Sequence, residues 1–259
     1  MMNRLLFLGT GGSMGVPVIG CPCAICHSNS LFNKRLRPSV LIIIGTRQFL
    51  VDAGPDFRMQ ALRIDLTHLD GILLTHAHHD HTAGIDDLRP IYYRREQPLP
   101  VLLSAQTAQD IQARYYYIFQ SPLNQPLFTP RMRLQILPAD EGEVLFEGLK
   151  IGYFSYQQGD MTVNGFRIGH LAYLTDIRQF SPSIFTHLVG VKDLVISALR
   201  YTPSPLHLSI DEAIEFAATI KAERVWLTHL SHDLDYEKVM SQLPAHVRLA
   251  YDGLEIPFE

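Results

Sequence analysis

The stretch "LLTHAHHDHTAG", residues 73–84, places four histidines and one aspartate within six positions, in a chain that holds 12 histidines in all. Such side chains are costly to bury without partners, so packing in an apolar core does not explain this density. The spacing His76-x-His78-x-Asp80-His81 follows an apolar run, 72–74, that is typical of a buried strand. Side chains alternate along an extended chain, so His76 and His78 can hold one ion, while Asp80 and His81 can reach a second. The pattern predicts a metal site at the carboxyl end of a strand.

Composition sets limits on the function. The chain has 259 residues, is 47% hydrophobic and 19% charged, and carries a net charge of −4. These values are ordinary for a folded globular protein, and a long nucleic acid is disfavoured as a partner because there is no overall basic field. The apolar runs are too short to span a bilayer, and the opening "MMNRLLFLGTGG" predicts a first strand rather than a signal peptide. We therefore expect a cytoplasmic enzyme with no membrane partner.

The three cysteines form a second cluster, Cys21-x-Cys23-x-x-Cys26, which His27 follows. An odd number of cysteines this close together argues against a disulfide framework. Three thiolates and one imidazole make a closed tetrahedral zinc set, so the motif predicts a structural zinc. The fourth ligand is either His27 or a distant histidine, and unligated thiols in a reducing cytoplasm are the alternative.

Strand-like and helix-like segments alternate in two groups along the chain. We expect strands at 4–10, 39–44, 49–54, 72–74, 133–137, 143–156, 165–169, 170–176, 193–199 and 224–229, and helices after Gly84, over 107–119, from Ser209 to Ile220 and over 236–243. Two sheets packed face to face, with helices outside, would bury all of these apolar runs. Asp176, His207 and His229 each follow one of the later strands, which predicts that they converge with the 76–81 cluster at one edge. Asp52, in "VDAG", either orients a metal-binding histidine or stabilises a turn.

The motifs together resemble a known family. "THAHHDHTAG", "YLTD" and "WLTH" are similar to the metal-binding segments of the metallo-β-lactamase superfamily. The opening "LGTGGSMGVPVIGCPCAICHSN", with "RPSVLI" and "FLVDAGPDFR", resembles the branch that contains phosphoribosyl 1,2-cyclic phosphate phosphodiesterase. The resemblance implies an α/β fold, a four-layer αββα sandwich formed by one domain over residues 1–259.

The resemblance also implies a role for each candidate residue. His76 and His78 would bind a first metal, and Asp176 would bridge to a second metal bound by Asp80, His81 and His229. Cys21, Cys23 and Cys26 would hold a separate structural Zn²⁺, with His232 rather than His27 as the fourth ligand. His207 would face the substrate.

One position departs from the family pattern. Gln158 stands where the resemblance predicts a third histidine for the first metal. An amide oxygen is a weaker zinc ligand than imidazole. Three outcomes therefore remain open: Gln158 binds through oxygen and favours a harder ion such as Mn²⁺, the first site is weak and the enzyme holds mainly one metal, or catalysis has been lost.

These observations predict a metal-dependent hydrolase, with Zn²⁺ or Mn²⁺ at a one- or two-metal centre, that acts on a small phosphodiester, cyclic or linear. Asp80, as a metal ligand, and His207, as a general acid, are the expected catalytic residues. A catalytically impaired metal-holding or binding protein is the alternative because of Gln158, and lactone or thioester hydrolysis is a further one. The sequence leaves open whether the chain forms a homodimer.

Overall fold

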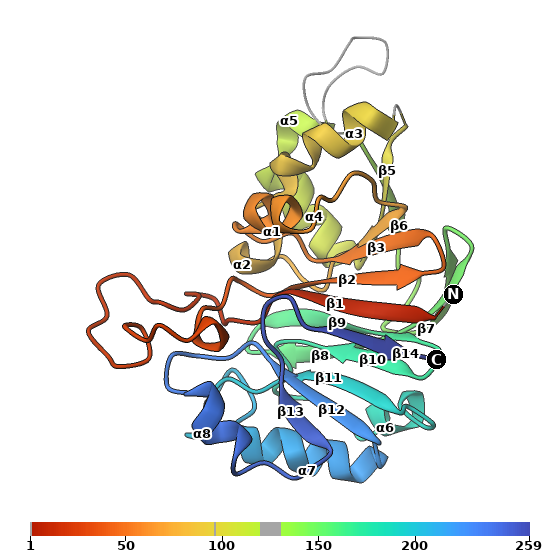
Figure 1. Ribbon diagram of the computed structural model, residues 1–259. Helices are drawn as coiled ribbons and strands as arrows, with labels where there is room; N and C mark the ends of the chain where they lie inside the picture. Colours follow the sequence, from red (N-terminus) through yellow and green to blue (C-terminus); the bar gives the residue numbers. More distant parts are fainter. Residues whose placement is uncertain (1, 96, 120–130) are drawn as a thin grey trace.

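The structure is a computed structural model that describes residues 2–95, 97–119 and 131–259. Figure 1 shows two sheets across the middle of the molecule, one group of helices above them and another below. The chain therefore forms a four-layer αββα sandwich, as the sequence predicted.

The first sheet is built mainly from the N-terminal half of the chain. Its order is β14-β1-β2-β3-β4-β5-β6. Pairing is antiparallel from β14 to β3 and parallel from β3 to β6. The strands are β1 (Asn3–Gly9), β2 (Ser39–Ile44), β3 (Arg47–Val51), β4 (Gly71–Leu73), β5 (Leu99–Leu103), β6 (Met132–Ile136) and β14 (Glu255–Phe258).

The second sheet has the order β13-β12-β11-β10-β9-β8-β7. Its strands β10 to β13 are parallel, and β7 to β10 are antiparallel. The strands are β7 (Glu141–Phe146), β8 (Leu149–Gln158), β9 (Met161–Ile168), β10 (Leu171–Leu174), β11 (Asp193–Ser197), β12 (Arg224–Thr228) and β13 (Val247–Leu249). β14 returns the C-terminal end of the chain to the first sheet.

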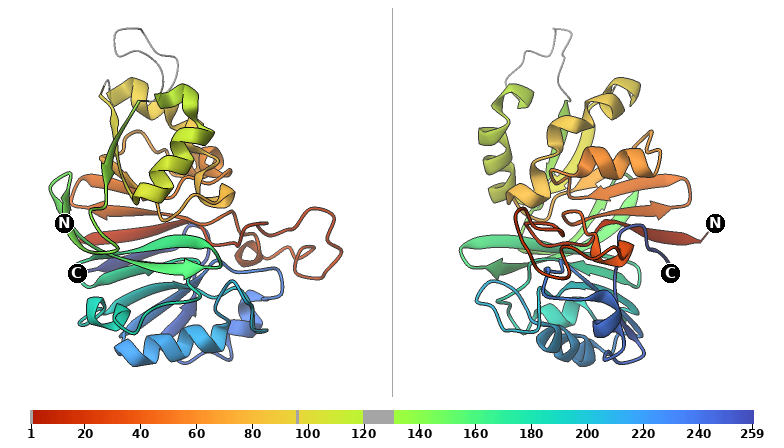
Figure 2. Two further views of the ribbon diagram at one scale, coloured as in Figure 1. Left: turned by 180° about the vertical axis from the view of Figure 1, so that it is seen from behind. Right: turned by 60° about the vertical axis from the view of Figure 1, so that its left-hand side comes forward.

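Helices cover the outer face of each sheet, which the two views in Figure 2 make clear. Over the first sheet lie α1 (Phe57–Arg63), α2 (His79–Thr82), α3 (Arg89–Arg95), α4 (Ala105–Arg114) and α5 (Tyr116–Phe119). Over the second lie α6 (Ile184–His187), α7 (Ile210–Ile220) and α8 (Tyr236–Met240). α7 begins with a complete capping box, in which Ser209 and Glu212 each accept a hydrogen bond from the other's backbone N–H.

The alternation of apolar residues along the strands explains the layers. On β1, Phe7 joins the core between the two sheets, whereas Leu8 packs under the outer helices. The same holds on β10, where Tyr173 faces the other sheet and Leu174 faces α7. Because both faces of each sheet are covered, the central strands are apolar on successive residues rather than on alternate ones.

The sequence missed several elements of this fold. β5 and α1 were not predicted, whereas α3 is the helix expected after Gly84. The helix expected over 107–119 is divided at Tyr115 into α4 and α5. A turn at 45–46 joins β2 and β3, with Gly45 at a φ of +63°. No helix in the described part of the chain is both long enough and apolar enough to cross a bilayer.

Candidate metal centres

Three strands deliver their terminal side chains to one rim of the sandwich. Asp52 follows β3, Asp176 lies just after β10 and His229 follows β12. All three have a left-handed backbone, with φ of 60°, 54° and 59° respectively. Positive φ is uncommon for residues other than glycine and is concentrated at functional sites. The backbone turns sharply at each strand end, which brings the side chains back over the edge of the sheets.

The predicted ligands of the second metal converge there. His81 Nε2 lies 3.1 Å from Asp176 Oδ2 and 3.4 Å from Asp80 Oδ2. His229 Nε2 lies 3.3 Å from Asp176 Oδ1 and 3.5 Å from Asp80 Oδ2. Ligand atoms about 2.0–2.2 Å from a shared tetrahedral ion lie roughly 3.3–3.6 Å apart, so this arrangement matches a zinc-like site.

Unpaired polar atoms provide an independent test of this fit. Asp80 Oδ2, His81 Nε2 and His229 Nε2 are buried and have no hydrogen-bond partner. Such atoms cost about 1–3 kcal/mol each when left unsatisfied, so the cluster favours a bound cation that satisfies all three. The residues present therefore fit the metal that the sequence predicted.

The electrostatics of the cluster also favour a cation. Burial alone would raise the pKa of Asp176, but His229 and His81 hold it well below its usual range. Burial likewise opposes the charge on His81, yet the carboxylates of Asp80, Asp176 and Asp52 raise the pKa of His81 well above its ordinary value. The carboxylates thus make the rim favourable for positive charge.

The predicted first-metal pair lies beside this cluster. His76 Nε2 and His78 Nδ1 are 2.9 Å apart, and His76, His81 and Asp176 can bring one ligand atom each within 4.8 Å of one another. Burial, together with the charge of His81, lowers the pKa of His76 well below its ordinary value. His76 is therefore neutral near pH 7, which is the state that binds metal ions.

Asp52 determines which nitrogens of His81 and His76 carry protons. Its fully buried carboxylate can only accept, so His81 Nδ1, at 2.7 Å from Oδ2, is a donor. The Thr75 hydroxyl also donates to Asp52 Oδ2, and it can therefore accept from His76 Nδ1 at 2.9 Å. In the neutral rings, both Nε2 atoms are therefore the ones that carry a lone pair toward the cluster. The sequence left the role of Asp52 open and did not predict a role for Thr75. The only sequence feature that points to Thr75 is its position next to His76.

Gln158 and His207 close the other side of the cluster. Gln158 Nε2 donates to Asp176 Oδ1 at 2.8 Å and lies 3.1 Å from His207 Nε2, while the Gln158 Oε1 atom is buried without a partner. His207 Nδ1 lies 3.6 Å from Asp176 Oδ1. Burial, reinforced by His229, lowers the pKa of His207 to about 4. The structure therefore brings both residues to the rim, with an uncharged imidazole at neutral pH.

The cysteine cluster is completed from the far end of the chain. His232 Nδ1 lies 3.3, 3.5 and 3.6 Å from the Sγ atoms of Cys21, Cys23 and Cys26. With Zn–S near 2.3 Å and Zn–N near 2.0–2.1 Å, tetrahedral geometry requires a separation of about 3.5 Å. A hydrogen bond from the Cys26 backbone N–H lowers the pKa of Cys23 to about 6. His27 instead bonds to the carbonyl oxygen of Cys23.

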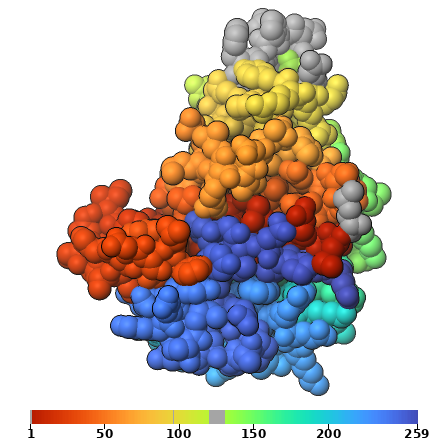
Figure 3. All heavy atoms as spheres, viewed as in Figure 1, coloured from red at the N-terminus to blue at the C-terminus, as the bar shows by residue number. Residues whose placement is uncertain are grey.

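This cysteine cluster lies on an arm, residues 12–38, that projects from the side of the molecule (Figure 3). Buried Arg35 connects the arm to the segment that carries His229 and His232. Its guanidinium donates to the carbonyl oxygens of Ser231 and Leu234, at 2.8 and 2.6 Å. The two candidate metal sites therefore share one loop, three residues apart on the chain.

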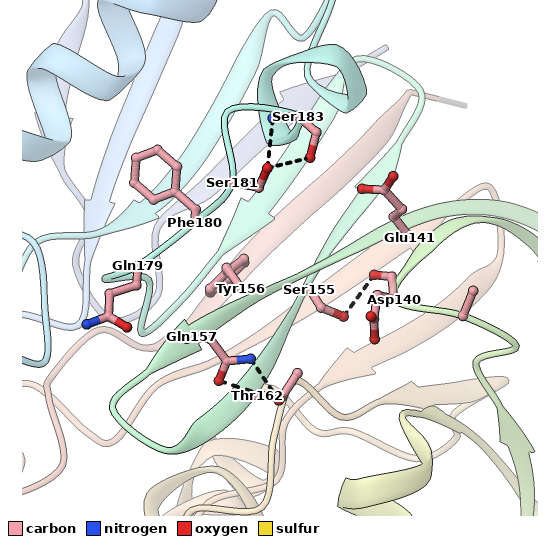
Figure 4. Close-up of a pocket in the computed structure, with 11 residues that line it drawn as sticks. Asp140, Glu141, Ser155, Tyr156, Gln157, Thr162, Gln179, Phe180, Ser181 and Ser183 are labelled. Carbon is pink, nitrogen blue, oxygen red and sulfur yellow. Dashed lines mark hydrogen bonds between the residues drawn. The ribbon is translucent and has the colours of Figure 1, made fainter.

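A polar pocket of about 840 Å³ lies beside β8 (Figure 4). Gln157 lines it, whereas Gln158 faces the metal cluster, because neighbouring side chains on a strand point in opposite directions. Serine, threonine, glutamine and acidic side chains dominate the lining, and no described lining residue is basic. This pocket is therefore a poor site for an anion and is not the predicted catalytic site.

Comparison with known proteins agrees with the fold and the motifs. A family model described as a beta-lactamase superfamily domain matches residues 47–230. The chain belongs to the metallo-β-lactamase superfamily. Within it, the chain falls in the PhnP-like branch. A crystal structure described as a new diphosphatase from the PhnP family is 35% identical, with a TM-score of 0.90 over 99% of this chain and 98% of that one. The fold, the site chemistry and this relative define a metallo-β-lactamase-fold protein with a candidate metal centre.

Two other relatives differ in length or similarity. An octanoyltransferase of Porphyromonas gingivalis strain W83 is 36% identical over 97% of this chain, but the chain spans only about half (51%) of that protein. Zinc-bound PqqB from Methylobacterium extorquens is 18% identical with a TM-score of 0.76, covering 98% of this chain and 99% of that one. The PqqB comparison bears on the fold alone.

Proposed function

We propose that the chain hydrolyses a small phosphodiester, cyclic or linear. The observation that carries the proposal is the convergence of Asp80, His81, Asp176 and His229, whose facing atoms lie 3.1–3.5 Å apart. The similar diphosphatase of the PhnP family supports phosphorus as the reacting centre.

The residues at the rim would divide the work. Divalent ions such as Zn²⁺ or Mn²⁺, when bound, supply a nucleophilic hydroxide at neutral pH and neutralise charge on phosphoryl oxygens. Asp80, His81 and His229 would hold one ion, His76 and His78 another, with Asp176 between them. Asp52 keeps the proton on Nδ1 of His81, which leaves Nε2 free to bind.

His207 is the candidate for delivering a proton to the leaving alkoxide. Its ring is buried beside Asp176, at the edge of the cluster. The negative charge of a phosphoryl substrate would favour its protonated form and oppose the effect of burial.

The test is hydrolysis of bis(p-nitrophenyl) phosphate by the Mn²⁺- or Zn²⁺-loaded protein, alongside a lactone and an acyl thioester. Asp80→Ala should abolish phosphodiester turnover while the protein stays folded. Asp87→Ala, a matched change at an exposed aspartate on the same side of the sandwich, should retain it. Turnover of the lactone or thioester alone would favour the alternative chemistry instead, and an active Asp80→Ala variant would refute the site.

Gln158 supports a second candidate, a metal-holding protein without turnover. Its Nε2 donates to Asp176 Oδ1, so the amide already occupies one side of the bridging carboxylate. Its unpartnered Oε1 could serve as a weak oxygen ligand for a hard ion such as Mn²⁺. The number of bound ions per chain, in the wild type and in Gln158→His, separates the candidates. If the first site is empty in the wild type and Gln158→His fills it without producing turnover, the second candidate holds.

For the cysteine cluster we propose a structural Zn²⁺ bound by Cys21, Cys23, Cys26 and His232. The S–N separations of 3.3–3.6 Å support four-coordinate binding. The set uses all four positions, as structural zinc sites do, so the cluster would stabilise the arm rather than bind substrate.

A further inference from the structure

The metal-binding segment is held from outside by the end of α4. Arg114 donates through Nη1 to the carbonyl oxygen of Ala77 at 2.7 Å and to Thr82 Oγ1 at 3.0 Å. The Thr82 hydroxyl in turn donates to the carbonyl oxygen of His78 at 2.8 Å. The neighbouring Tyr115 hydroxyl donates to the carbonyl oxygen of Thr82 at 2.9 Å. One guanidinium therefore begins a network that reaches both ends of the segment from Ala77 to Thr82.

The position of these bonds relative to His78 gives them a specific effect. The carbonyl groups of Ala77 and His78 flank the α-carbon of His78, and the network holds both of them. The His78 ring is only partly buried, so packing restrains it less than it restrains fully buried His76. The position of its backbone therefore contributes directly to where Nδ1 lies relative to His76 Nε2, 2.9 Å away.

Local structure explains why an arginine can do this. α4 begins at an N-cap, Ser104, whose side chain accepts from the Thr107 backbone N–H immediately after β5. β5 pairs in parallel with β4, so the helix that follows it runs back over the helical face of the first sheet. Arg114 is the last residue of α4, where positive charge is favourable to the helix dipole. Its side chain is exposed overall, yet its Nη1 is hydrogen-bonded to the carbonyl oxygen of buried Ala77.

We propose that Arg114 is a positioning residue that holds the His76–His81 segment in its metal-binding geometry. The inference rests on the proposed metal-binding role of His76 and His78. Without Arg114, the buried carbonyl of Ala77 keeps, among the described residues, only a long contact of 3.4 Å from Thr82 Oγ1. The segment would then relax to find another donor, and the facing nitrogens of His76 and His78 would separate.

The test measures metal affinity by competition with a chromophoric chelator, with Mn²⁺ or Zn²⁺ as the probe. Arg114→Met keeps the apolar stem but removes the hydrogen-bond donors. We expect it to lower the affinity for the ion that His78 helps to bind about tenfold. Arg114→Lys can still donate to the carbonyl oxygen of Ala77 and should therefore keep most of the wild-type metal affinity. Gln112→Met, an exposed position on the same helix, is the matched control and should bind as the wild type does.

A double variant and steady-state kinetics separate the outcomes. In a His78→Ala background, Arg114→Met should cause no further loss, because the two residues act on the same site. A full tenfold loss in that background, or wild-type affinity in Arg114→Met, would overturn the inference. So would a raised KM with unchanged metal affinity, which would mark direct substrate contact. If the wild type binds no His78-dependent ion, the proposed first site fails, and this inference with it.

Discussion

Replacing Asp52 with asparagine tests the hydrogen-bond logic of the rim without changing the size of the side chain. Asp52 accepts three hydrogen bonds, from Thr75 N and Thr75 Oγ1 at 2.8 Å each and from His81 Nδ1 at 2.7 Å. If the asparagine oxygen keeps the bond from Thr75 N, its NH₂ group faces His81. His81 must then move its proton to Nε2, the atom that points at the metal cluster. The opposite orientation sets NH₂ against the Thr75 backbone N–H, which is also unfavourable.

The expected magnitude follows from the bond that is lost. A hydrogen bond to a charged group contributes about 1.5–3 kcal/mol. Since about 1.4 kcal/mol corresponds to a factor of ten, the loss predicts roughly 10- to 100-fold weaker metal binding in Asp52→Asn, within the range seen for residues that orient metal ligands. Phosphodiester turnover at subsaturating metal should fall in parallel.

Chelator competition, with circular dichroism to confirm folding, provides the assay. Asp70→Asn is the matched control, because Asp70 also accepts a backbone N–H, from Gln48 at 2.8 Å, but precedes β4 at the opposite end of the sheet. A folded Asp52→Asn protein with wild-type metal affinity would refute the tautomer argument.

Three further predictions follow from separate features. In Gly54→Ala, the new methyl group would collide with the carbonyl oxygen of Asp80, so we expect loss of catalytic metal, measured by elemental analysis; full occupancy would contradict this close contact. Cys23→Ser should remove one zinc per chain and lower the melting temperature, whereas unchanged zinc content would mean that the three thiols bind none. Burial raises the pKa of Asp252 from 3.8 to about 6, so its ionised form is disfavoured in the folded state. This group should therefore reduce the free energy of unfolding by up to about 3 kcal/mol as the pH rises from about 4 to 6. In Asp252→Asn, the free energy of unfolding measured in urea should lack this decrease with pH. Parallel pH profiles for the variant and the wild type would contradict the raised pKa of Asp252.

The sequence predicted most of the second sheet and the ligand-bearing strand ends, for a local reason. Apolar runs such as 171–174 and 224–228 are followed at once by polar groups, and that change marks the end of a buried strand wherever the strand lies. β5, by contrast, carries the apolar run "LPVLL", in which Pro100 argues against a central strand. Its identity as a strand depends on pairing with β4 and β6, which are distant in sequence.

By itself, the sequence determined the kinds of chemistry available: the spacing of His76, His78, Asp80 and His81, and three thiols within six residues. Local periodicity is enough for this, because neighbouring side chains on one strand or turn must lie close together. Tertiary structure alone decided which distant groups complete each set. The left-handed turns at Asp176 and His229 bring those side chains to the rim, and Arg35 holds the loop that carries His232 to the cysteines. Hydrogen bonds between residues far apart in the chain, such as the one from Arg114 to Ala77, depend on how helices pack on sheets, and no local pattern encodes them.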